Sequence, residues 1–261
     1  MDTMVSPEER TISVHSEHEF LLKLEKAGLV HDHTQKVIGS KDNELAKKII
    51  RLIENGGFEP STSQKVARGI MGKNFFGIEE AIKHFGVNPS KQQLAYLAEV
   101  PFTEEVLRSC KDTHVLIAIF PLSILDLRGI CRKIENQVLF YNQDWYNKQT
   151  FAQEKGGIGW QLVRKELVAD STNKTWDEQQ VILSKDESTP KAQVAVYTMI
   201  GHYLATGERL FEKVYVRCSD LGSDGYRVRV GNFAAEGLVV SDSWDGGRDA
   251  RLGLASARNC N

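Results

Sequence analysis

The last part of the chain contains no lysine, no glutamine and no methionine. The last of the 19 lysines is Lys213, the last methionine is Met199 and the last glutamine is Gln193. Every basic residue after Lys213 is an arginine. This break in composition needs an explanation, and it directs attention to the stretch from Val214 to Arg258.

Long apolar runs are absent as well. The longest, VLIAIF at 115–120, falls far short of the roughly 18 apolar residues of a membrane helix, so we predict no membrane insertion. The first residues, MDTMVSPEERTISV, lack the basic patch and apolar run of a secretory signal. We therefore expect a cytoplasmic protein.

The chain also lacks an excess of positive charge and a cysteine framework. The net charge is -2 and the pI is near 6.4, which gives no reason to expect a nucleic-acid partner. Cys110, Cys131, Cys218 and Cys260 are widely spaced and form no C-x-x-C pair, which favours buried or free thiols. Since no histidines, cysteines and carboxylates recur at ligand spacing, we predict no metal and no cofactor.

Helical signals dominate the first 112 residues. Capping residues and apolar residues at helical spacing predict helices over 16–28, 42–54, 61–71, 77–85, 91–98 and 104–110. Strand signals begin with THVLIAIF at 113–120, a continuous apolar run typical of a buried strand. We therefore predict a helical N-terminal region over 1–112 and a second domain over 113–261.

The second domain combines strands with two helices. Strands are predicted at 138–146, where a turn follows, and at 159–164. A capping box of Thr175 with Glu178 opens one helix, and Thr189-Pro190 opens a longer one. Short strands between glycines then follow, among them Arg227–Val230, which alternates charged and apolar residues. This order predicts an α+β fold and not an alternating α/β sheet.

Four segments of the second domain carry a resemblance. They are G-W-x-L-V-R at 159–164, T-W-D-E-Q at 175–179, the long helix at 190–205 and W-D-x-x-R-x-x-x-L-G-L-A-S-A-R at 244–258. Together they resemble the C-type-lectin-like fold, in the branch shared with formylglycine-generating enzymes and bacterial surface modules. More narrowly, residues 214–258 are similar to the variable proteins of diversity-generating retroelements.

The resemblance implies an explanation for the missing residue types. In such systems a reverse transcriptase copies a template repeat with errors at adenines, and the altered copy replaces the 3′ end of the gene. Codons of the AAY type then become a range of residues that excludes Lys, Gln, Glu, Met and Trp. The absence of Lys, Gln and Met after Lys213 fits this restriction. Trp244 and Glu236 lie outside the allowed set, so we assign Trp244 to the scaffold and expect Glu236 to be fixed or differently encoded.

By the same resemblance, the C-terminal positions divide into two interleaved sets. The fixed set supplies an apolar face and an ion pair of Asp245 with Arg248, and it comprises Arg227, Val228, Val230, Phe233, Leu238, Val240, Trp244, Asp245, Arg248, Leu252 and Leu254. The variable set is polar, small or aromatic, and it comprises Tyr226, Arg229, Asn232, Ala234, Ala235, Val239, Ser241, Asp242, Ser243, Gly246, Gly247, Asp249, Ala250 and Arg251. We predict that the variable set binds an unknown protein or other macromolecule and that the protein is not an enzyme. A homo-oligomer is compatible with the sequence.

The sequence leaves three alternatives to this function open. An oxidase of the formylglycine-generating type would use Cys218 with Cys260. A calcium loop would use Asp220–Gly225, but Gly222 stands where a ligand is required, and a tight turn is favoured. A surface or assembly protein would use the helical N-terminal region as an oligomerisation or docking module.

Overall fold

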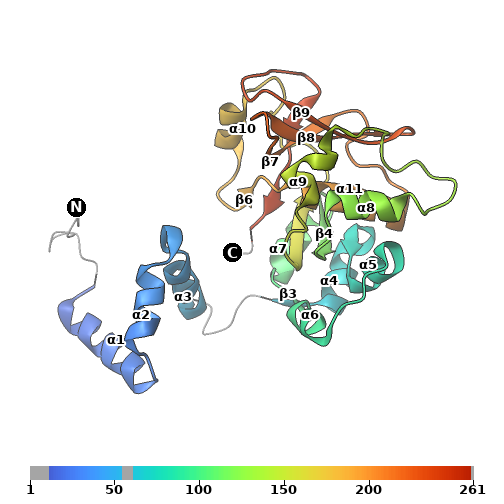
Figure 1. Cartoon of the computed structure of the whole chain (residues 1–261). Helices are drawn as coiled ribbons and strands as arrows, with labels where there is room; N and C mark the ends of the chain where they lie inside the picture. Colours follow the sequence, from blue (N-terminus) through green and yellow to red (C-terminus); the bar gives the residue numbers. More distant parts are fainter. Residues whose placement is uncertain (1–11, 55–60, 260–261) are drawn as a thin grey trace. The chain divides into compact units, whose positions relative to one another are not determined.

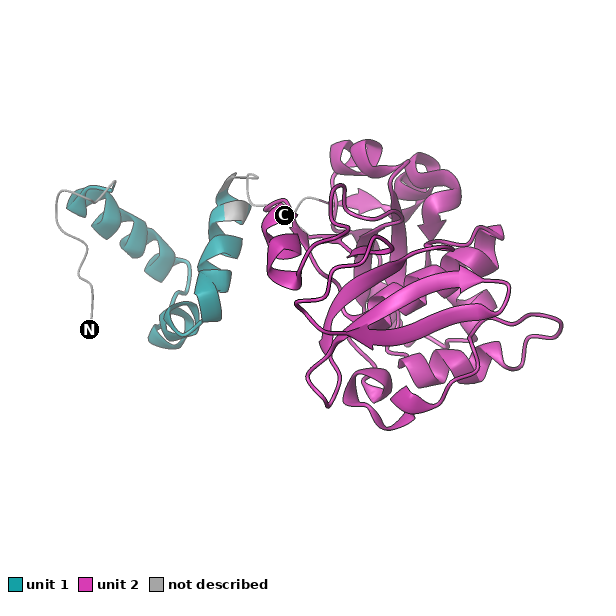
Figure 2. Cartoon of the chain, turned by 90° about the horizontal axis from the view of Figure 1, so that it is seen from above, with its two compact units in different colours: residues 1–59 teal, residues 60–261 magenta. Residues whose placement is uncertain are grey.

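The structure is a computed structural model that describes residues 12–54 and 61–259 (Figure 1). It mixes helices with strands, and the described residues form a five-stranded, a four-stranded and a two-stranded sheet. Two compact units divide the chain, residues 1–59 and residues 60–261 (Figure 2). Within the described ranges, no helix is both long enough and apolar enough to cross a membrane.

The boundary between the two units lies earlier than the sequence indicated. We predicted a change after residue 112, whereas the two compact units meet between residues 59 and 60. The helices of residues 61–112 bury apolar side chains in the core of the second unit, where the ring centroid of Phe85 lies 4.6 Å from that of Tyr197. Those helices therefore share one core with the strands that follow them.

The N-terminal unit contains the helices α1 (Val14–Lys26), α2 (His31–Ile38) and α3 (Glu44–Glu54), with the short 3-10 turn η2 (Lys41–Asn43) before α3. The cap of α1 is Ser13, whose hydroxyl accepts from the Ser16 amide, so the helix begins two residues before the predicted start at 16. α2 follows Val30, which offers no capping side chain, and the sequence signals did not reveal it. No described side chain of this unit is buried.

The second unit opens with four helices that the sequence predicted. They are α4 (Gln64–Met71), α5 (Ile78–Phe85), α6 (Lys91–Tyr96) and α7 (Glu104–Cys110), accompanied by the 3-10 turn η3 (Gly72–Asn74) and the paired strands β1 (Thr62–Ser63) and β3 (Glu99–Val100). Ser90 and Thr103 cap α6 and α7, directly before the predicted starts at 91 and 104. Gly86 ends α5 in a left-handed conformation that suits glycine.

The five-stranded sheet lies at the centre of this unit. Its order is β2 (Phe75–Phe76), β4 (His114–Ile119), β5 (Gly159–Arg164), β11 (Ala257–Arg258) and β6 (Glu187–Ser188). Every residue of β4 is buried, as the apolar run predicted. The helices α8 (Ile124–Cys131) and α11 (Ala192–Thr206) belong to the same core. Gly201 lets α11 approach the sheet, because a Cβ there would lie 3.1 Å from the Phe76 ring.

The strand predicted at 138–146 is not formed, although the structure describes all of these residues. Phe140 makes a single bridge to Leu238, and the chain then enters the 3-10 helix η4 (Trp145–Lys148) and α9 (Thr150–Gln153). The side chains of Gln143 and Trp145 both donate to the Val240 carbonyl, at 2.6 and 2.9 Å. These side-chain bonds occupy an acceptor that a longer strand pair would use.

The four-stranded sheet contains the stretch with the unusual composition. Its order is β10 (Leu252–Leu254), β7 (Tyr215–Leu221), β8 (Arg227–Ala234) and β9 (Gly237–Ser243). β7, β8 and β9 pair antiparallel, and β10 returns parallel to β7. One face packs on α11, where the Tyr203 and Phe233 rings lie 5.3 Å apart. α10 (Trp176–Ile182) begins with the predicted capping box of Thr175 and Glu178.

A buried histidine lies in the five-stranded sheet. His114 Nε2 is 3.6 Å from Glu187 Oε1, and Arg164 Nη2 lies 3.4 Å from the same oxygen. Burial and the charge of Arg164 lower the pKa of His114 from 6.5 to about 4, although Glu187 opposes the shift. The folded protein therefore holds a neutral imidazole at pH values where the unfolded chain already binds a proton. Linkage then requires stability to fall as the pH drops from about 6.5 towards 4.

Replacing His114 by glutamine is expected to flatten this dependence. The glutamine amide does not titrate. Between neutral pH and pH 4 the free energy of unfolding of His114→Gln should therefore fall by on the order of 3 kcal/mol less than that of the parent chain. Urea unfolding of His114→Gln and the parent chain at a series of pH values measures the difference. Identical pH profiles for the two chains would contradict the assignment.

Candidate ligand-binding surface

Twelve of the fourteen predicted variable positions lie on β8, on β9 and in the loop 244–251, whereas Tyr226 directly precedes β8 and Ala235 lies in the turn between β8 and β9. None of them is buried: each is partly or largely exposed. The apolar residues between them are buried, namely Val228, Val230, Phe233, Leu238, Val240, Leu252 and Leu254. Along 228–230 and 238–241 the pleat of the strands separates the two sets, because neighbouring side chains point to opposite faces. The partly exposed run 241–243 and the loop 244–251 do not follow this alternation.

One buried arginine holds the loop 244–251 against the sheet. Arg217, on β7, is 0% exposed. Its Nη1 donates to the Lys174 carbonyl at 2.9 Å and to Gln179 Oε1 at 3.0 Å. Its Nη2 donates to the carbonyls of Trp244 and Gly247 at 3.2 and 2.7 Å. Burial lowers the pKa of this guanidinium, and Asp245 opposes that shift. The sequence did not lead us to predict a role for Arg217. A signal was present, because Arg217 stands on a strand between the apolar residues Val216 and Cys218 and therefore lies on the face of the strand opposite to theirs.

A second arginine holds the start of the loop. Arg227 makes two bonds to the Asp245 carboxylate, 3.0 and 2.8 Å long, and donates to the Ser219 carbonyl at 2.7 Å. Its guanidinium lies 3.8 Å from the centroid of the Trp176 ring, on α10. A bidentate pair stacked on an aromatic ring is a rigid arrangement, so Asp245 is tied to β8 and α10 together.

The predicted ion pair of Asp245 with Arg248 is therefore wrong. Arg248 lies beyond the Gly246-Gly247 turn and bonds instead to Glu178 at 2.7 Å and to the Asn173 carbonyl at 3.0 Å. The pairing follows from the register: Ser243 stands opposite Arg227, so Asp245, two residues further on, comes within reach of Arg227. Both ion pairs join the loop to neighbouring elements.

Main-chain atoms of the loop make further bonds to the scaffold. The amides of Trp176, Asn173 and Tyr215 donate to the carbonyls of Asp245, Asp249 and Arg251, at 2.8, 3.1 and 2.7 Å. These bonds do not depend on which side chains stand in the variable positions of the loop. The path of the loop is thus set mainly by its backbone and by the fixed residues Asp245 and Arg248, and one further bond runs from the Arg251 amide to the side chain of the variable Asp249, at 2.7 Å.

A positively charged group on the same sheet, Arg229, forms no ion pair within 4.0 Å among the described residues, although its charge acts on Asp242 and opposes the rise that burial causes in the pKa of that carboxyl. The guanidinium of Arg229 lies 4.7 Å from the centroid of the Tyr215 ring. Among the described residues, no carboxylate approaches it within 4.0 Å, and its Nε, like Ser243 Oγ, is buried without a hydrogen-bond partner. Tyr226, the residue before β8, is 45% exposed. Arg229 and the two tyrosines can therefore contact a molecule bound to this surface.

Trp244 differs from its predicted role. We assigned it to the scaffold, but its side chain is 67% exposed, and only its carbonyl takes part in the anchor at Arg217. The indole lies beside Gly246, where an added Cβ would come within 2.6 Å of the ring. An exposed indole of this kind belongs to the surface and not to the core.

Asn232 is the most constrained of the predicted variable positions. Its φ is 45°, in the left-handed region, and its amide donates to the Val214 carbonyl at 2.7 Å. Asparagine, aspartate and glycine accept this conformation, whereas β-branched residues are strained in it. Gly231 before it has a φ of 141° and touches Val214 so closely that a Cβ would overlap the carbonyl oxygen. Backbone geometry thus limits which residues position 232 can hold.

The alternative sites have their groups already in use. Cys218 is fully buried in β7, and burial raises the pKa of its thiol, which disfavours the reactive thiolate. Its proposed companion, Cys260, lies outside the described residues. In the former calcium candidate, Asp220 accepts from the Ala192 amide at 2.5 Å and Asp224 accepts from Tyr226 at 3.1 Å. Residues 222–225 form the tight turn that was favoured.

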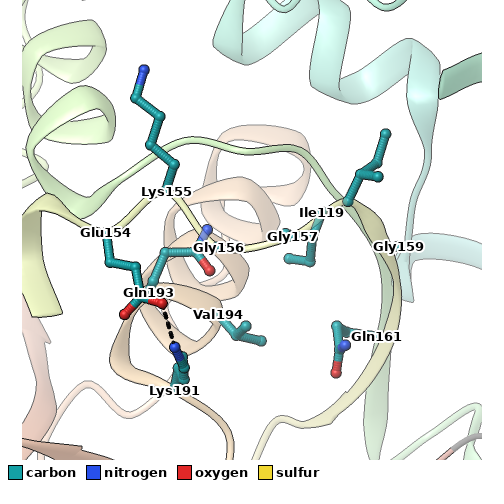
Figure 3. A pocket seen from close by; sticks show the side chains of 11 residues that line it. Ile119, Glu154, Lys155, Gly156, Gly157, Gly159, Gln161, Lys191, Gln193 and Val194 are labelled. Atoms are coloured by element: carbon teal, nitrogen blue, oxygen red, sulfur yellow. Dashed lines mark hydrogen bonds and ion pairs between the residues drawn. The ribbon is translucent and has the colours of Figure 1, made fainter.

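A separate cavity of about 400 Å³ lies at the start of α11 (Figure 3). Its lining includes three glycines, and its one ion pair joins Lys191 Nζ to Glu154 Oε1 at 2.6 Å. Lys155 extends away from the other labelled side chains (Figure 3). No histidine, cysteine or hydroxyl residue lines it, and the bond to Glu154 raises the pKa of Lys191, which keeps that amine protonated and weakens it as a nucleophile. Across the described ranges, no three His, Cys, Asp or Glu side chains gather as a metal site would require.

Comparisons of the chain with protein-family models, with curated protein sequences and with solved structures return no match. The function is therefore inferred from the arrangement of residues 214–258.

Substituting Arg217 by lysine is expected to destabilise the fold and loosen the loop. A lysine has a single nitrogen and cannot reach the three carbonyls and the Gln179 amide oxygen that the guanidinium fork satisfies. Each acceptor left buried without a donor costs about 1–3 kcal/mol, so Arg217→Lys should lose several kcal/mol of unfolding free energy. Hydrogen exchange at 244–251 should rise in parallel.

The matched control is Arg229→Lys on the neighbouring strand. No hydrogen bond of the Arg229 side chain is found among the described residues, and lysine retains the charge, so the loss should stay within about 0.5 kcal/mol. Equal losses in the two variants would mean that the carbonyl anchor is unimportant.

Proposed function

We propose that this chain is a non-catalytic ligand-binding protein with a C-type-lectin-like second unit, whose C-terminal surface is diversified by a retroelement. The ligand is a protein or another macromolecule. The exposed positions of β8, β9 and the loop 244–251 form the binding surface.

The order of elements supports the fold assignment. The segments behind the resemblance are β5, the start of α10, the helix α11 and the ending that holds β10 and β11. Ala257 of β11 pairs with Val163 of β5, so the first and last strands of this region lie side by side. The two ends of the region are therefore joined in one sheet. The strands β8 and β9 and the loop 244–251 lie between these ends in the sequence.

The observation that carries the proposal is the separation of the two interleaved sets. Positions expected to vary are exposed or partly exposed, and the apolar residues between them are buried. The loop is held through Arg217, through two ion pairs and through main-chain carbonyls. Side chains can change on such a surface without disturbing the core, since substitutions away from core contacts usually cost within about 0.5 kcal/mol.

The chemistry of the surface favours a macromolecular ligand. The three cavities lined by residues within 119–194, 84–155 and 128–142 include no residue of 214–258, whereas small molecules are usually held in concave pockets. Trp244, Tyr226 and Arg229 are of the residue types that most often carry binding energy at protein interfaces. The charge of Arg229, which has no carboxylate partner here, favours an acidic group on the ligand.

Burial of Cys218 argues against the oxidase alternative, because a cysteine oxidase needs an accessible thiol. An assembly protein with the same fold would have no need for a surface that tolerates wide substitution. Tolerance to substitution therefore separates that alternative from the proposal.

We expect chains with all fourteen variable positions randomised to fold. The library would draw on residues other than Lys, Gln, Glu, Met and Trp, with Asn, Asp or Gly at position 232, and most members should melt cooperatively near the parent temperature. Matched substitutions to alanine at Val228, Val230 and Phe233 should unfold the chain, because each removes buried side-chain atoms at a cost of about 1–5 kcal/mol. Wholesale unfolding of the surface library would refute the proposed function.

The DNA around the gene supplies an independent test. We expect a reverse-transcriptase gene nearby and a near-repeat of the coding 3′ end that differs mainly at adenines, in the codons of the variable positions. Sequencing the locus checks this. A locus with neither feature would leave a tolerant binding surface without the proposed source of diversity.

A further inference from the structure

Three arginines stand together on the face of the four-stranded sheet that points away from the core. Arg217 of β7 lies opposite Arg229 of β8, and Arg227 lies two residues before Arg229 and therefore on the same face. Among the described residues, Asp245 is the one carboxylate that forms an ion pair with any of them, and it pairs with Arg227. Three guanidinium groups thus share a single bonded carboxylate.

Of the three, Arg229 is the one that a ligand can reach. Arg217 and Arg227 are buried, and their Nη atoms are occupied by main-chain carbonyls, by Gln179 and by Asp245. Arg229 is partly exposed, and no hydrogen bond of its side chain is found among the described residues. Its Nε is buried without a partner, which costs free energy until an acceptor is supplied.

The neighbours of Arg229 prepare it to bind an oxygen acid. Its guanidinium lies 4.7 Å from the centroid of the Tyr215 ring, and this stacking restrains its orientation before a ligand arrives. On β9, Ser241 stands directly opposite Arg229, and Ser243 follows two residues further along the same face. Ser243 Oγ is also buried without a hydrogen-bond partner. A carboxylate has two acceptor oxygens, which suit a guanidinium with a nearby hydroxyl.

The charges of the three arginines act on one another. Burial lowers the pKa of Arg217, and the charges of Arg229 and Arg227 add to that lowering, whereas Asp245 opposes it. A negatively charged group bound at Arg229 would offset this repulsion. Because Arg217 and Arg227 hold the loop 244–251, their positive charge stays in place when the variable side chains change.

A single free guanidinium fits an acidic side chain better than a nucleic acid. Nucleic acids present a row of phosphates, and their binding depends on several cationic groups that can contact them. Arg217 and Arg227 are buried and already bonded, so they cannot supply such contacts. The variable set also contains Asp242 and Asp249, which a polyanion would have to approach.

We propose that the C-terminal surface recognises an aspartate or glutamate side chain of a protein ligand, which binds to the guanidinium of Arg229. This inference rests on the function proposed for that surface, because it names the chemistry of the ligand. Arg229 is then the residue that determines specificity in this chain.

A random peptide library displayed on phage and selected against the full chain supplies the probes. Selected peptides should contain Asp or Glu, and calorimetry should show that exchanging this residue for Asn or Gln weakens binding about tenfold or more. That factor corresponds to a lost charge-assisted hydrogen bond. The exchange is made in the peptide, so the protein and its fold stay unchanged.

Variants of the protein then locate the effect. Arg229→Gln should weaken the acidic peptide by the same factor and remove its advantage over the amide form. The matched control is Arg132→Gln, which removes the same charge from an exposed residue directly after α8, outside the proposed surface. It should bind both peptides as the parent chain does, and both variants should melt at the parent temperature.

The outcomes separate this inference from the proposed function. Selected peptides that Trp244→Ala weakens, but that bind equally in acidic and amide forms, would overturn the inference and leave the proposed function standing. If the selection yields no binder, or if neither Trp244→Ala nor Arg229→Gln weakens any binder, both are contradicted. A single-stranded oligothymidylate that binds through Arg229 more tightly than every peptide would overturn the inference in favour of nucleic acid.

Discussion

The C-terminal surface depends on an arginine that is buried without a carboxylate in hydrogen-bond contact. Arg217 donates to three main-chain carbonyls and one amide oxygen, which come from the loop before α10, from α10 itself and from the loop 244–251. A buried charge is tolerated only where its hydrogen bonds are made. The guanidinium therefore requires all of these segments in their places, and each of them gains a donor for an acceptor that would otherwise be unpaired.

This anchor separates the conformation of the loop from its side chains. Carbonyl groups are the same in every residue, so a loop held by its carbonyls keeps its path when its side chains change. Arg227 with Asp245 and Arg248 with Glu178 add fixed side-chain contacts at two further points of the loop. The surface between them is left to small, polar and aromatic groups, with the exposed indole of Trp244 and the unpaired charge of Arg229 as its largest features.

The two units differ in how they satisfy the need to bury apolar side chains. The second unit packs α11 between its sheets and encloses a continuous core, to which the helices of 61–112 contribute. The N-terminal unit has amphipathic helices but no buried side chain among its described residues. Its amphipathic pattern resembles that of the other helices, so pattern alone did not separate the units. The division became visible only from which helices share the core.

Local chemistry in the sequence determined the helices with caps, the buried strand β4 and the alternation along β8, because each depends on neighbours a few residues away. It also indicated which C-terminal side chains face the core. Only the tertiary structure decided the partners of Asp245 and Arg248, the burial of Arg217 and the exposure of Trp244. Each of these depends on strand register and on segments some 18 to 70 residues apart. The bent path of 138–146 has the same origin, since a carbonyl on β9 takes the side-chain bonds that turn this segment away from the sheet.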